Sequence, residues 1–259
     1  MNGNFSLKSE SGFSLVELIA VIVILGLISS VGVSFVIKTT QSYQDTQARA
    51  KMAMRARQAM ERMTRQLRAA LPYSVRVTNA GQCIEFMPIA SGGFYLNPVS
   101  DSQNTAPAQS SIVVAPHQID FGTADYMTIG AMSSTEIYGG SGLSIASVVS
   151  RNSTIVNLSG AKIWLRNSVN KRFYLLNSPQ AFCVDAGQLK YFENQSLSAA
   201  SINTTNGFSL LSSDVTATTP FRLTMASDNR NTEIVLSLTF SETGQSLDFI
   251  QQVMIRNVP

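Results

Sequence analysis

Few of the residues on which enzyme chemistry depends occur in this chain of 259 residues. It contains one histidine, two cysteines and one tryptophan, and only 14% of its residues are charged. The single histidine, His117, follows a proline in a strand-like stretch, and the sequence places no acid or nucleophile beside it. A catalytic histidine needs such a partner within hydrogen-bond reach. We therefore expect His117 to be a structural or surface residue, and we expect the protein not to be an enzyme.

The signatures of common cofactor and metal sites are missing as well. The glycine-rich stretch at residues 139–142 is not followed by the Lys-Ser/Thr pair of a phosphate-binding loop or by a long helical pattern, so it predicts a turn. The acidic residues beyond Pro72 do not show the alternating spacing of a calcium-binding loop. The sequence therefore predicts no cofactor and no metal ion.

Proline is missing from the first quarter of the chain, and charge is scarce in the apolar run at residues 13–37. No proline interrupts residues 13–71, and the apolar run at residues 13–37 carries a single charge, that of Glu17. A helix of about 20 apolar residues spans the hydrocarbon core of a bilayer, whereas a cleaved secretory signal has an apolar core of about 7 to 15 residues. The run therefore predicts a transmembrane helix, and a plain membrane anchor is the simplest alternative explanation.

Glu17 is the one residue of this run that an anchor does not need. A charged residue within a membrane span costs roughly 2.5 to 3.5 kcal/mol on insertion scales, so such residues usually serve a partner or an ion pathway. A proton pathway would need further ionisable residues in the span, and the span has none. Glu17 therefore needs a cation. Lys8 and Lys38 lie outside the run, whereas a chain cut after Gly12 would offer the new α-amino group of Phe13.

The string GFSLVEL at residues 12–18 resembles the class III signal of type IV prepilins and type II secretion pseudopilins. That signal is a short polar leader ending in glycine, then phenylalanine, then glutamate four residues later within an apolar helix. The resemblance implies that a membrane aspartyl peptidase cuts after Gly12, that the new terminal residue Phe13 is N-methylated, and that Glu17 pairs with the terminal amine of a neighbouring subunit. It also implies partners: the prepilin peptidase and N-methyltransferase, other minor and major pilins, and the assembly platform of the inner membrane.

Three further segments are similar to the O-type minor pilin of mannose-sensitive haemagglutinin pili, namely residues 65–77, 83–86 and 181–184. This similarity implies a minor pilin that takes part in initiating or assembling a type IV pilus filament. Alternatives are a type II secretion pseudopilin or a major pilin, although a chain of this size is bulky for the repeating subunit of a thin fibre. An alternative of a different class is a membrane-anchored periplasmic adhesin or enzyme. In the resembling family the subunit at the tip can lack the glutamate, so Glu17 places this chain below the tip.

The resemblance divides the chain into a leader at residues 1–12, a transmembrane and polymerisation helix at 13–37, an amphipathic basic stem at 38–71 and a periplasmic β-rich head at 72–259. The stem carries eight basic and two acidic residues, which by the positive-inside rule alone would place it in the cytoplasm. The leader must face the cytoplasm to be processed. We therefore expect a single-pass protein of the bacterial inner membrane with its head in the periplasm, and in the pilus filament after assembly.

The basic stem has nucleic-acid binding as an alternative explanation, because clustered arginines bind phosphate backbones. The stem interleaves arginine with methionine and alanine, however, rather than with aromatic or polar base-reading residues. This composition favours helix packing, and we expect no nucleic-acid partner.

The remaining patterns predict an α+β fold, in which the long N-terminal helix packs against a mainly antiparallel β-sheet head, as in pilins. Pro72 ends the predicted helix. Apolar residues mark one face of this helix, and from position 52 onward they recur at steps of three or four: Tyr43, Met52, Ala56, Ala59, Met63, Leu67 and Ala70. Alternating runs predict strands at 83–87, 118–121, 126–129, 173–176, 182–185, 188–192, 233–240 and 247–255, with hairpin connections at 185–188 and 241–245. The polar stretches at 97–110 and 194–219 are predicted to be loops.

Cys83 and Cys183 are the only cysteines, and each falls in a predicted strand of the head. An even pair of cysteines in an exported domain is more often bridged than free. We therefore predict a disulfide between Cys83 and Cys183, with two buried free thiols as the alternative.

Overall fold

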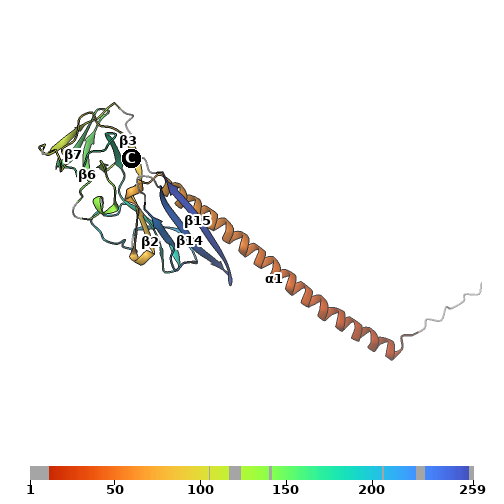
Figure 1. Ribbon diagram of the computed structural model, residues 1–259. Coiled ribbons are helices and arrows are strands. Elements are labelled where there is room, and N and C mark those ends of the chain that lie inside the picture. Colours follow the sequence, from red (N-terminus) through yellow and green to blue (C-terminus); the bar gives the residue numbers. More distant parts are fainter. Residues whose placement is uncertain are drawn as a thin grey trace, which may run out of the picture. The chain divides into compact units, whose positions relative to one another are not determined.

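The computed structural model describes residues 12–104, 106–116, 124–139, 142–205, 207–225 and 231–256. One long helix precedes a series of antiparallel strands, so the predicted α+β class is confirmed (Figure 1). The chain divides into two compact units, one up to Ala50 and one from Lys51 onward. The predicted domain boundaries at residues 12, 37 and 71 stay predictions. His117, the strand predicted at 118–121 and the middle of the 139–142 turn lie outside the described residues.

Helix α1 extends over Leu15–Arg68, three residues short of the end that Pro72 predicted. Its last turn tightens, since the N–H groups of Ala69 and Ala70 donate to carbonyls three residues earlier. The N–H of Leu71 then donates to the carbonyl of Met87 at 2.9 Å, and the Ala69 carbonyl accepts from the N–H of Ile89 at 2.9 Å. The predicted helix end was therefore wrong by three residues, because these residues bond to a segment distant in the sequence instead of continuing the helix.

Three antiparallel sheets make up the strands of the second unit. The first has the order β1 (Arg76–Thr78), β2 (Cys83–Phe86), β9 (Gln180–Asp185), β10 (Gln188–Phe192) and β11 (Phe208–Ser213). In the second, β14 (Thr232–Glu242) pairs with β15 (Gln245–Ile255), and also with β12 (Val215–Thr216) and β13 (Phe221–Thr224). The third has the order β3 (Ile89–Phe94), β8 (Arg172–Leu176), β5 (Tyr126–Thr128), β6 (Ile145–Arg151), β7 (Ile155–Lys162) and β4 (Gln109–Val113). Short 3₁₀ turns lie at Pro72–Ser74, Asn79–Gly81 and Ser134–Glu136.

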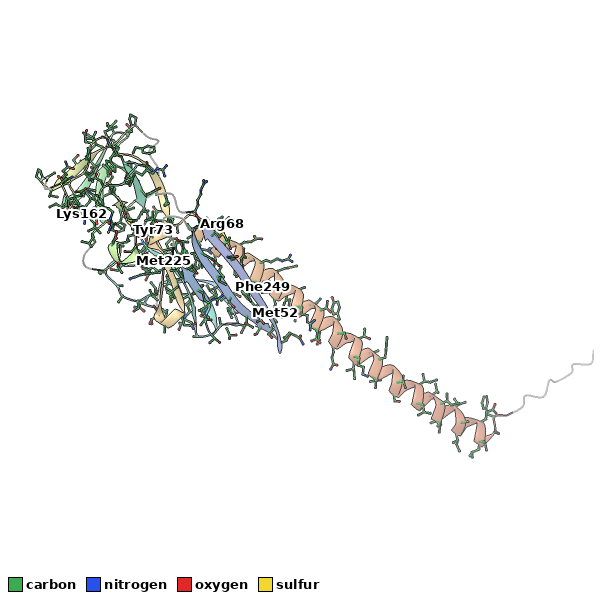
Figure 2. All side chains as sticks on the ribbon, viewed as in Figure 1. Met52, Arg68, Tyr73, Lys162, Met225 and Phe249 are labelled. Carbon is green, nitrogen blue, oxygen red and sulfur yellow. A yellow bond between two sulfur atoms is a disulfide. The ribbon has the colours of Figure 1, made fainter. Side chains whose placement is uncertain are left out.

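The main hydrophobic core joins the C-terminal part of α1 to the first two sheets. Figures 1 and 2 show β14 and β15 alongside the part of α1 between Met52 and Arg68. The predicted apolar face of the helix is buried from Met52 onward, and Met60, which the prediction omitted, is buried with it. Tyr43 was assigned to this face wrongly: it is 63% exposed, and its hydroxyl accepts a hydrogen bond from Gln47 Nε2 at 2.6 Å on the helix surface.

Both predicted hairpins are present, and both have two-residue turns. Ala186 and Gly187 connect β9 to β10 with positive φ angles of 51° and 73°, as a turn of the type I′ family requires. Thr243 and Gly244 connect β14 to β15 with φ angles of 47° and 80°. The pairing continues down to Glu242 opposite Gln245, so this connection is tighter than the predicted loop at 241–245.

The prediction of loops was wrong in part. Strands β11 and β12 lie within the stretch 194–219, and β4 begins at Gln109 within the stretch 97–110. Strand β11 is held by its hydrogen bonds to β10. Its own polar sequence does not predict this pairing, so the strand was missed. Further strands of the described residues that the sequence did not predict are β1, β3, β6, β7 and β13.

Candidate functional site

The predicted cleavage point lies in exposed, non-helical chain just before α1. Gly12, Phe13 and Ser14 precede the first helical residue, and the Phe13 side chain is 76% exposed. A Cβ atom added at Gly12 would meet no atom of the described structure within 4 Å, and its φ angle is not positive. Neither packing nor backbone strain therefore requires glycine here.

Ser14 caps the helix, a role that the sequence analysis missed. Its Oγ accepts a hydrogen bond from the N–H of Glu17 at 3.2 Å, and its carbonyl oxygen accepts one from the N–H of Leu18, also at 3.2 Å. The spacing Ser-x-x-Glu at the start of an apolar helix is that of a capping box, and this signal could have identified Ser14. The cap fixes the helical start and places Glu17 in the first turn of α1.

Glu17 has no counter-charge in the described structure. The four ion pairs among the described residues are Arg55–Glu242, Arg76–Glu85, Arg166–Glu136 and Lys190–Asp185, and none involves Glu17. A carboxylate in the first turn interacts favourably with the helix dipole, typically by about 0.3 to 1 kcal/mol at an exposed site. That gain is smaller than the cost of placing a charge in a membrane, so the dipole alone does not account for Glu17.

The rest of the N-terminal segment is apolar on every side. All residues from Phe13 to Ile37 are exposed within the unit, and the helix has an 18-residue window of mean hydropathy 2.7 with none of it buried. The hydroxyls of Ser30 and Ser34 donate to carbonyls of their own helix at 2.9 and 3.0 Å. A helix that is apolar all round must be covered by lipid or by other helices, and Glu17 carries the one charged side chain between Phe13 and Ile37.

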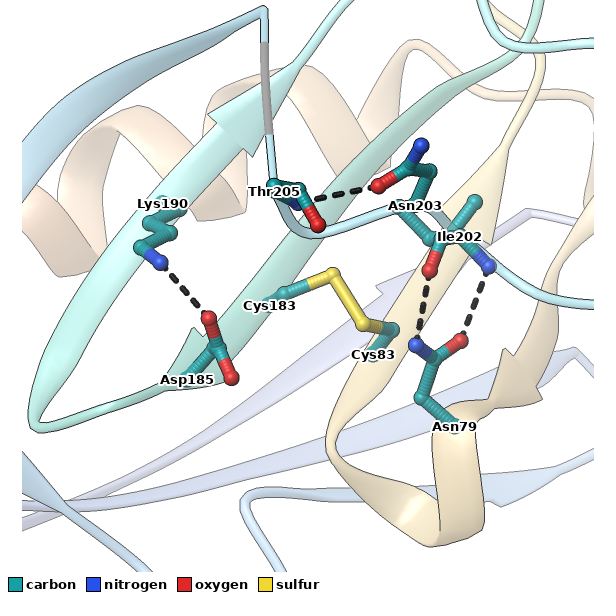
Figure 3. Close-up of a disulfide and its surroundings, with 8 residues drawn as sticks. All are labelled: Asn79, Cys83, Cys183, Asp185, Lys190, Ile202, Asn203 and Thr205. Atoms are coloured by element: carbon teal, nitrogen blue, oxygen red, sulfur yellow. Dashed lines mark hydrogen bonds and ion pairs between the residues drawn. A yellow bond between two sulfur atoms is a disulfide. The ribbon is translucent and has the colours of Figure 1, made fainter.

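The structure joins Cys83 of β2 to Cys183 of β9 by the predicted disulfide (Figure 3). The two cysteines are directly opposite each other in the antiparallel pair, and both are fully buried together with Ala181, Phe192 and Ile202. The Asn79 side chain fixes the backbone of Ile202 at this cluster: Nδ2 donates to the Ile202 carbonyl and Oδ1 accepts from the Ile202 N–H, both at 2.8 Å. The bridge is therefore a buried structural element of the head.

This disulfide leads to a prediction about stability. It closes a loop with a sequence separation of 100 residues, for which loop-closure entropy gives an upper-end stabilisation of about 4.7 kcal/mol. Replacing both Cys83 and Cys183 by alanine should lower the free energy of unfolding by up to this amount, as measured by denaturant unfolding of the membrane-extracted chain. The unreduced, denatured wild-type protein should take up no thiol reagent, and labelling at both positions would disprove the bridge.

The described part of the head offers no metal site. No group of three or more His, Cys, Asp or Glu side chains within the described residues could hold a metal ion. The buried carboxylate of Glu85 is paired with Arg76 at 2.6 Å, and burial raises the pKa of Glu85 although the guanidinium of Arg76 opposes this shift. The pair lies against Tyr138, with the Arg76 guanidinium 3.9 Å from the ring centroid. The Arg76–Glu85 pair and its contact with Tyr138 therefore have a structural role, because they join separate segments of the head.

Comparison with known proteins supports the N-terminal segment as the site. A family profile described as the prokaryotic N-terminal methylation motif matches residues 7–33. No curated protein and no solved structure matches the chain. The match covers the stretch around Gly12, Phe13 and Glu17 and much of the apolar span. The chain therefore carries a type IV prepilin-like signal of the kind that prepilin peptidase processes, followed by a helix suited to anchoring in the inner membrane and to pilus assembly.

Proposed function

We propose that this protein is a minor pilin, processed by prepilin peptidase between Gly12 and Phe13, that takes part in initiating or assembling a type IV pilus filament and has no enzymatic activity. The observation that carries the proposal is the carboxylate of Glu17, five residues after Gly12, which has no ion-pair partner among the described residues and lies on a helix whose apolar surface has no cover of its own. Cleavage would create a positively charged amine at Phe13. A neighbouring subunit would then supply the cation that Glu17 lacks.

The assembly step follows from the chemistry of these groups. N-methylation leaves the amine of Phe13 basic, so the group stays a cation. In lipid or between packed helices neither this cation nor the Glu17 carboxylate has water as an alternative partner, which strengthens their attraction. The apolar surfaces of residues 13–37 supply the packing area, and the ion pair sets the register between neighbouring helices.

The segments that resemble the O-type minor pilin of mannose-sensitive haemagglutinin pili lie together in the fold. Residues 65–77 include the end of α1, a 3₁₀ turn and the start of β1, residues 83–86 are β2, and residues 181–184 belong to β9. Strands β1, β2 and β9 are neighbours in one sheet, and the disulfide joins the last two. This contiguity supports the minor-pilin subclass over a chance likeness of three short strings, with a type II secretion pseudopilin or a major pilin as the alternatives.

The head belongs in the periplasm on this proposal. The disulfide between Cys83 and Cys183 supports an oxidising compartment, because such bridges are rare in the cytosol. The leader would then face the cytoplasm. A membrane-anchored adhesin or enzyme would share this topology, but a tether alone gives no reason to retain Glu17 in the span.

The experiment that tests the proposal is a count of subunits in filaments sheared from the cells that make the protein. We expect quantitative mass spectrometry to find this chain as a small fraction of the main subunit, and deletion of its gene to lower the number of filaments. A chain present in equal or greater amount than any other subunit would be a major pilin. Absence from filaments together with normal filament number after deletion would contradict a role in assembly.

A further inference from the structure

The second unit contains a cavity of about 340 Å³ next to the end of α1. Its walls come from the segment after the helix, from β3, β5 and β8, from the loop before β8 and from the C-terminal end of β15. The apolar part of the lining includes Leu71, Pro72, Ile89, Tyr174 and Ile255. The volume lies at the low end of the roughly 300 to 1,000 Å³ usual for ligand pockets. It therefore suits one or two side chains better than a large cofactor.

One wall of the cavity is fixed by an ion pair. Arg166 donates to the two carboxylate oxygens of Glu136 at 2.6 and 3.0 Å and to the Gly130 carbonyl at 2.7 Å. Burial alone would raise the pKa of the Glu136 carboxyl. This effect is outweighed by the charge of Arg166 and by hydrogen bonds from Arg166, the Met132 N–H and the Ser144 hydroxyl, so the pKa of Glu136 is lowered. Gly130 has a φ angle of 61°, and a Cβ there would lie 2.9 Å from Arg166 Cγ. The wall is thus close-packed and preformed.

The remaining charges at the cavity are positive. Of the residues that the structure describes, four arginines line it, Arg68, Arg166, Arg172 and Arg256, and no acidic side chain does. Arg166 is neutralised by Glu136, and the Arg172 guanidinium lies 5.8 Å from the centroid of the Phe94 ring. Arg68 and Arg256 are both exposed, and neither has an ion-pair or hydrogen-bond partner among the described residues. The mouth therefore presents cations that attract a carboxylate.

The rim is also apolar where solvent reaches it. Val169 is 96% exposed and Met132 is 49% exposed, and both line the cavity. Exposed apolar side chains grouped around a pocket mark interaction sites, and arginine is enriched at the energetically important positions of protein interfaces. The surface formed by the cavity, Val169, Met132, Arg68 and Arg256 is called the arginine-rimmed pocket below.

We propose that the arginine-rimmed pocket binds a segment of another polypeptide, which places an apolar side chain in the cavity and an adjacent aspartate or glutamate against Arg68 and Arg256. Charge complementarity selects an acidic segment, and the small preformed cavity selects a side-chain anchor. The choice of a different polypeptide over a second copy rests on the proposed function, in which other subunits outnumber this one. The contact belongs to the head and is separate from the helix contacts of Glu17.

The test places a photo-crosslinking amino acid, p-benzoylphenylalanine, at Val169 of the full chain in the cells that make it, and identifies the cross-linked peptide by mass spectrometry. We expect an adduct with one segment of a different protein, carrying an acidic residue within about three positions of the attachment point. A synthetic peptide of that segment should then bind the full chain in nanodiscs, as measured by fluorescence anisotropy, with an affinity that falls as salt is added.

Matched variants separate the pocket from general charge. Arg68→Gln combined with Arg256→Gln should weaken binding of the peptide by about tenfold, which corresponds to about 1.4 kcal/mol for the loss of two exposed ion pairs together. Arg65 lies in the same last turn of α1 as Arg68 but does not line the cavity, so Arg65→Gln should leave binding unchanged. The same cross-linker at Val149, which is 70% exposed on β6, is the control for random capture.

Four outcomes would overturn the proposal: no adduct above the Val149 control, a lipid adduct, an adduct with a second copy of this chain, or an affinity indifferent to the two arginines. The intact mass of the processed chain and the subunit count of the filaments report on the proposed function separately. A missing cross-link in cells with processed protein and normal filaments therefore disproves the pocket alone.

Discussion

Gly12→Leu is expected to leave the unprocessed chain of residues 1–259 in the membrane, with no protein that begins at Phe13. The structure gives Gly12 no packing or backbone role, because an added Cβ meets nothing within 4 Å. A leucine there should therefore change recognition by the peptidase and leave the fold intact. Intact-mass spectrometry of the membrane-extracted protein measures the result directly. The wild-type chain should have the mass of residues 13–259 with one added methyl group.

Gly26, a glycine within helix α1, provides the control for this substitution. Gly26 also has open space around an added Cβ, so Gly26→Leu makes the same change of side chain within α1 and away from the cleavage point. This variant should be processed as the wild type is. The prepilin interpretation would be wrong if the wild-type chain kept its leader in cells with an active peptidase, or if cleavage fell after Ser29, as in a secretory signal.

The site was predictable from the sequence because its residues are neighbours in the chain. Gly12, Phe13 and Glu17 form a linear motif at the start of α1, and the resemblance of this motif to prepilin signals indicated their roles. The capping role of Ser14 also belongs to this local pattern, although it was overlooked. The arginine-rimmed pocket could not be found in this way, because Arg68 and Arg256 are far apart in the sequence of the second unit and only the fold brings both to one cavity.

The fold was predictable where periodicity was strong and local. Strand β10 has the predicted bounds, and the hairpin of β14 and β15 was recognised from its alternation of apolar and polar residues. Strands β6 and β7 were missed because serine and asparagine interrupt their alternation and several of their residues are exposed. The two strands pair with each other, and each also pairs with a strand more distant in the sequence, β6 with β5 and β7 with β4. Single-strand patterns do not contain that information.

The structure also corrects the reasoning about where the helix ends. Pro72 cannot continue a helix, and this set the predicted end at residue 71. The observed end at Arg68 depends instead on hydrogen bonds that join the stretch from Ala69 to Leu71 to Met87 and Ile89. Hydrogen bonding to this sheet segment therefore replaces further helical hydrogen bonds and sets the helix end, and Pro72 lies beyond that end.

Glu17→Ala is expected to abolish the contribution of this subunit to filament assembly while leaving its insertion, processing and fold unchanged. The carboxylate has no partner in the described structure, so the folded chain does not depend on it. In a helix-packed fibre its pair with the Phe13 amine should be worth more than the roughly 0 to 1 kcal/mol of a solvated surface pair. The alanine variant should also insert more easily, because a charge is removed from the span. A loss of assembly could therefore not be attributed to failed insertion.

Two variants separate the charge of Glu17 from its position at the helix start. Ser14→Ala removes the capping hydrogen bond to the Glu17 N–H at a cost of roughly 0.5 to 2 kcal/mol of helix stability, and it keeps the carboxylate. Glu17→Gln keeps the size and hydrogen-bonding capacity of the side chain and removes its charge. If the ion pair is the cause, Ser14→Ala should assemble and Glu17→Gln should fail as Glu17→Ala does.

The measurement is the number of filaments per cell, together with the amount of this chain in sheared filaments. Intact mass and the oxidised state of Cys83 and Cys183 show that each variant is processed and folded. Filaments at wild-type number that contain the Glu17→Ala subunit would refute the ion-pair role. Failure of Ser14→Ala alone would instead assign the effect to the helix start, because that variant retains the charge and loses only the cap.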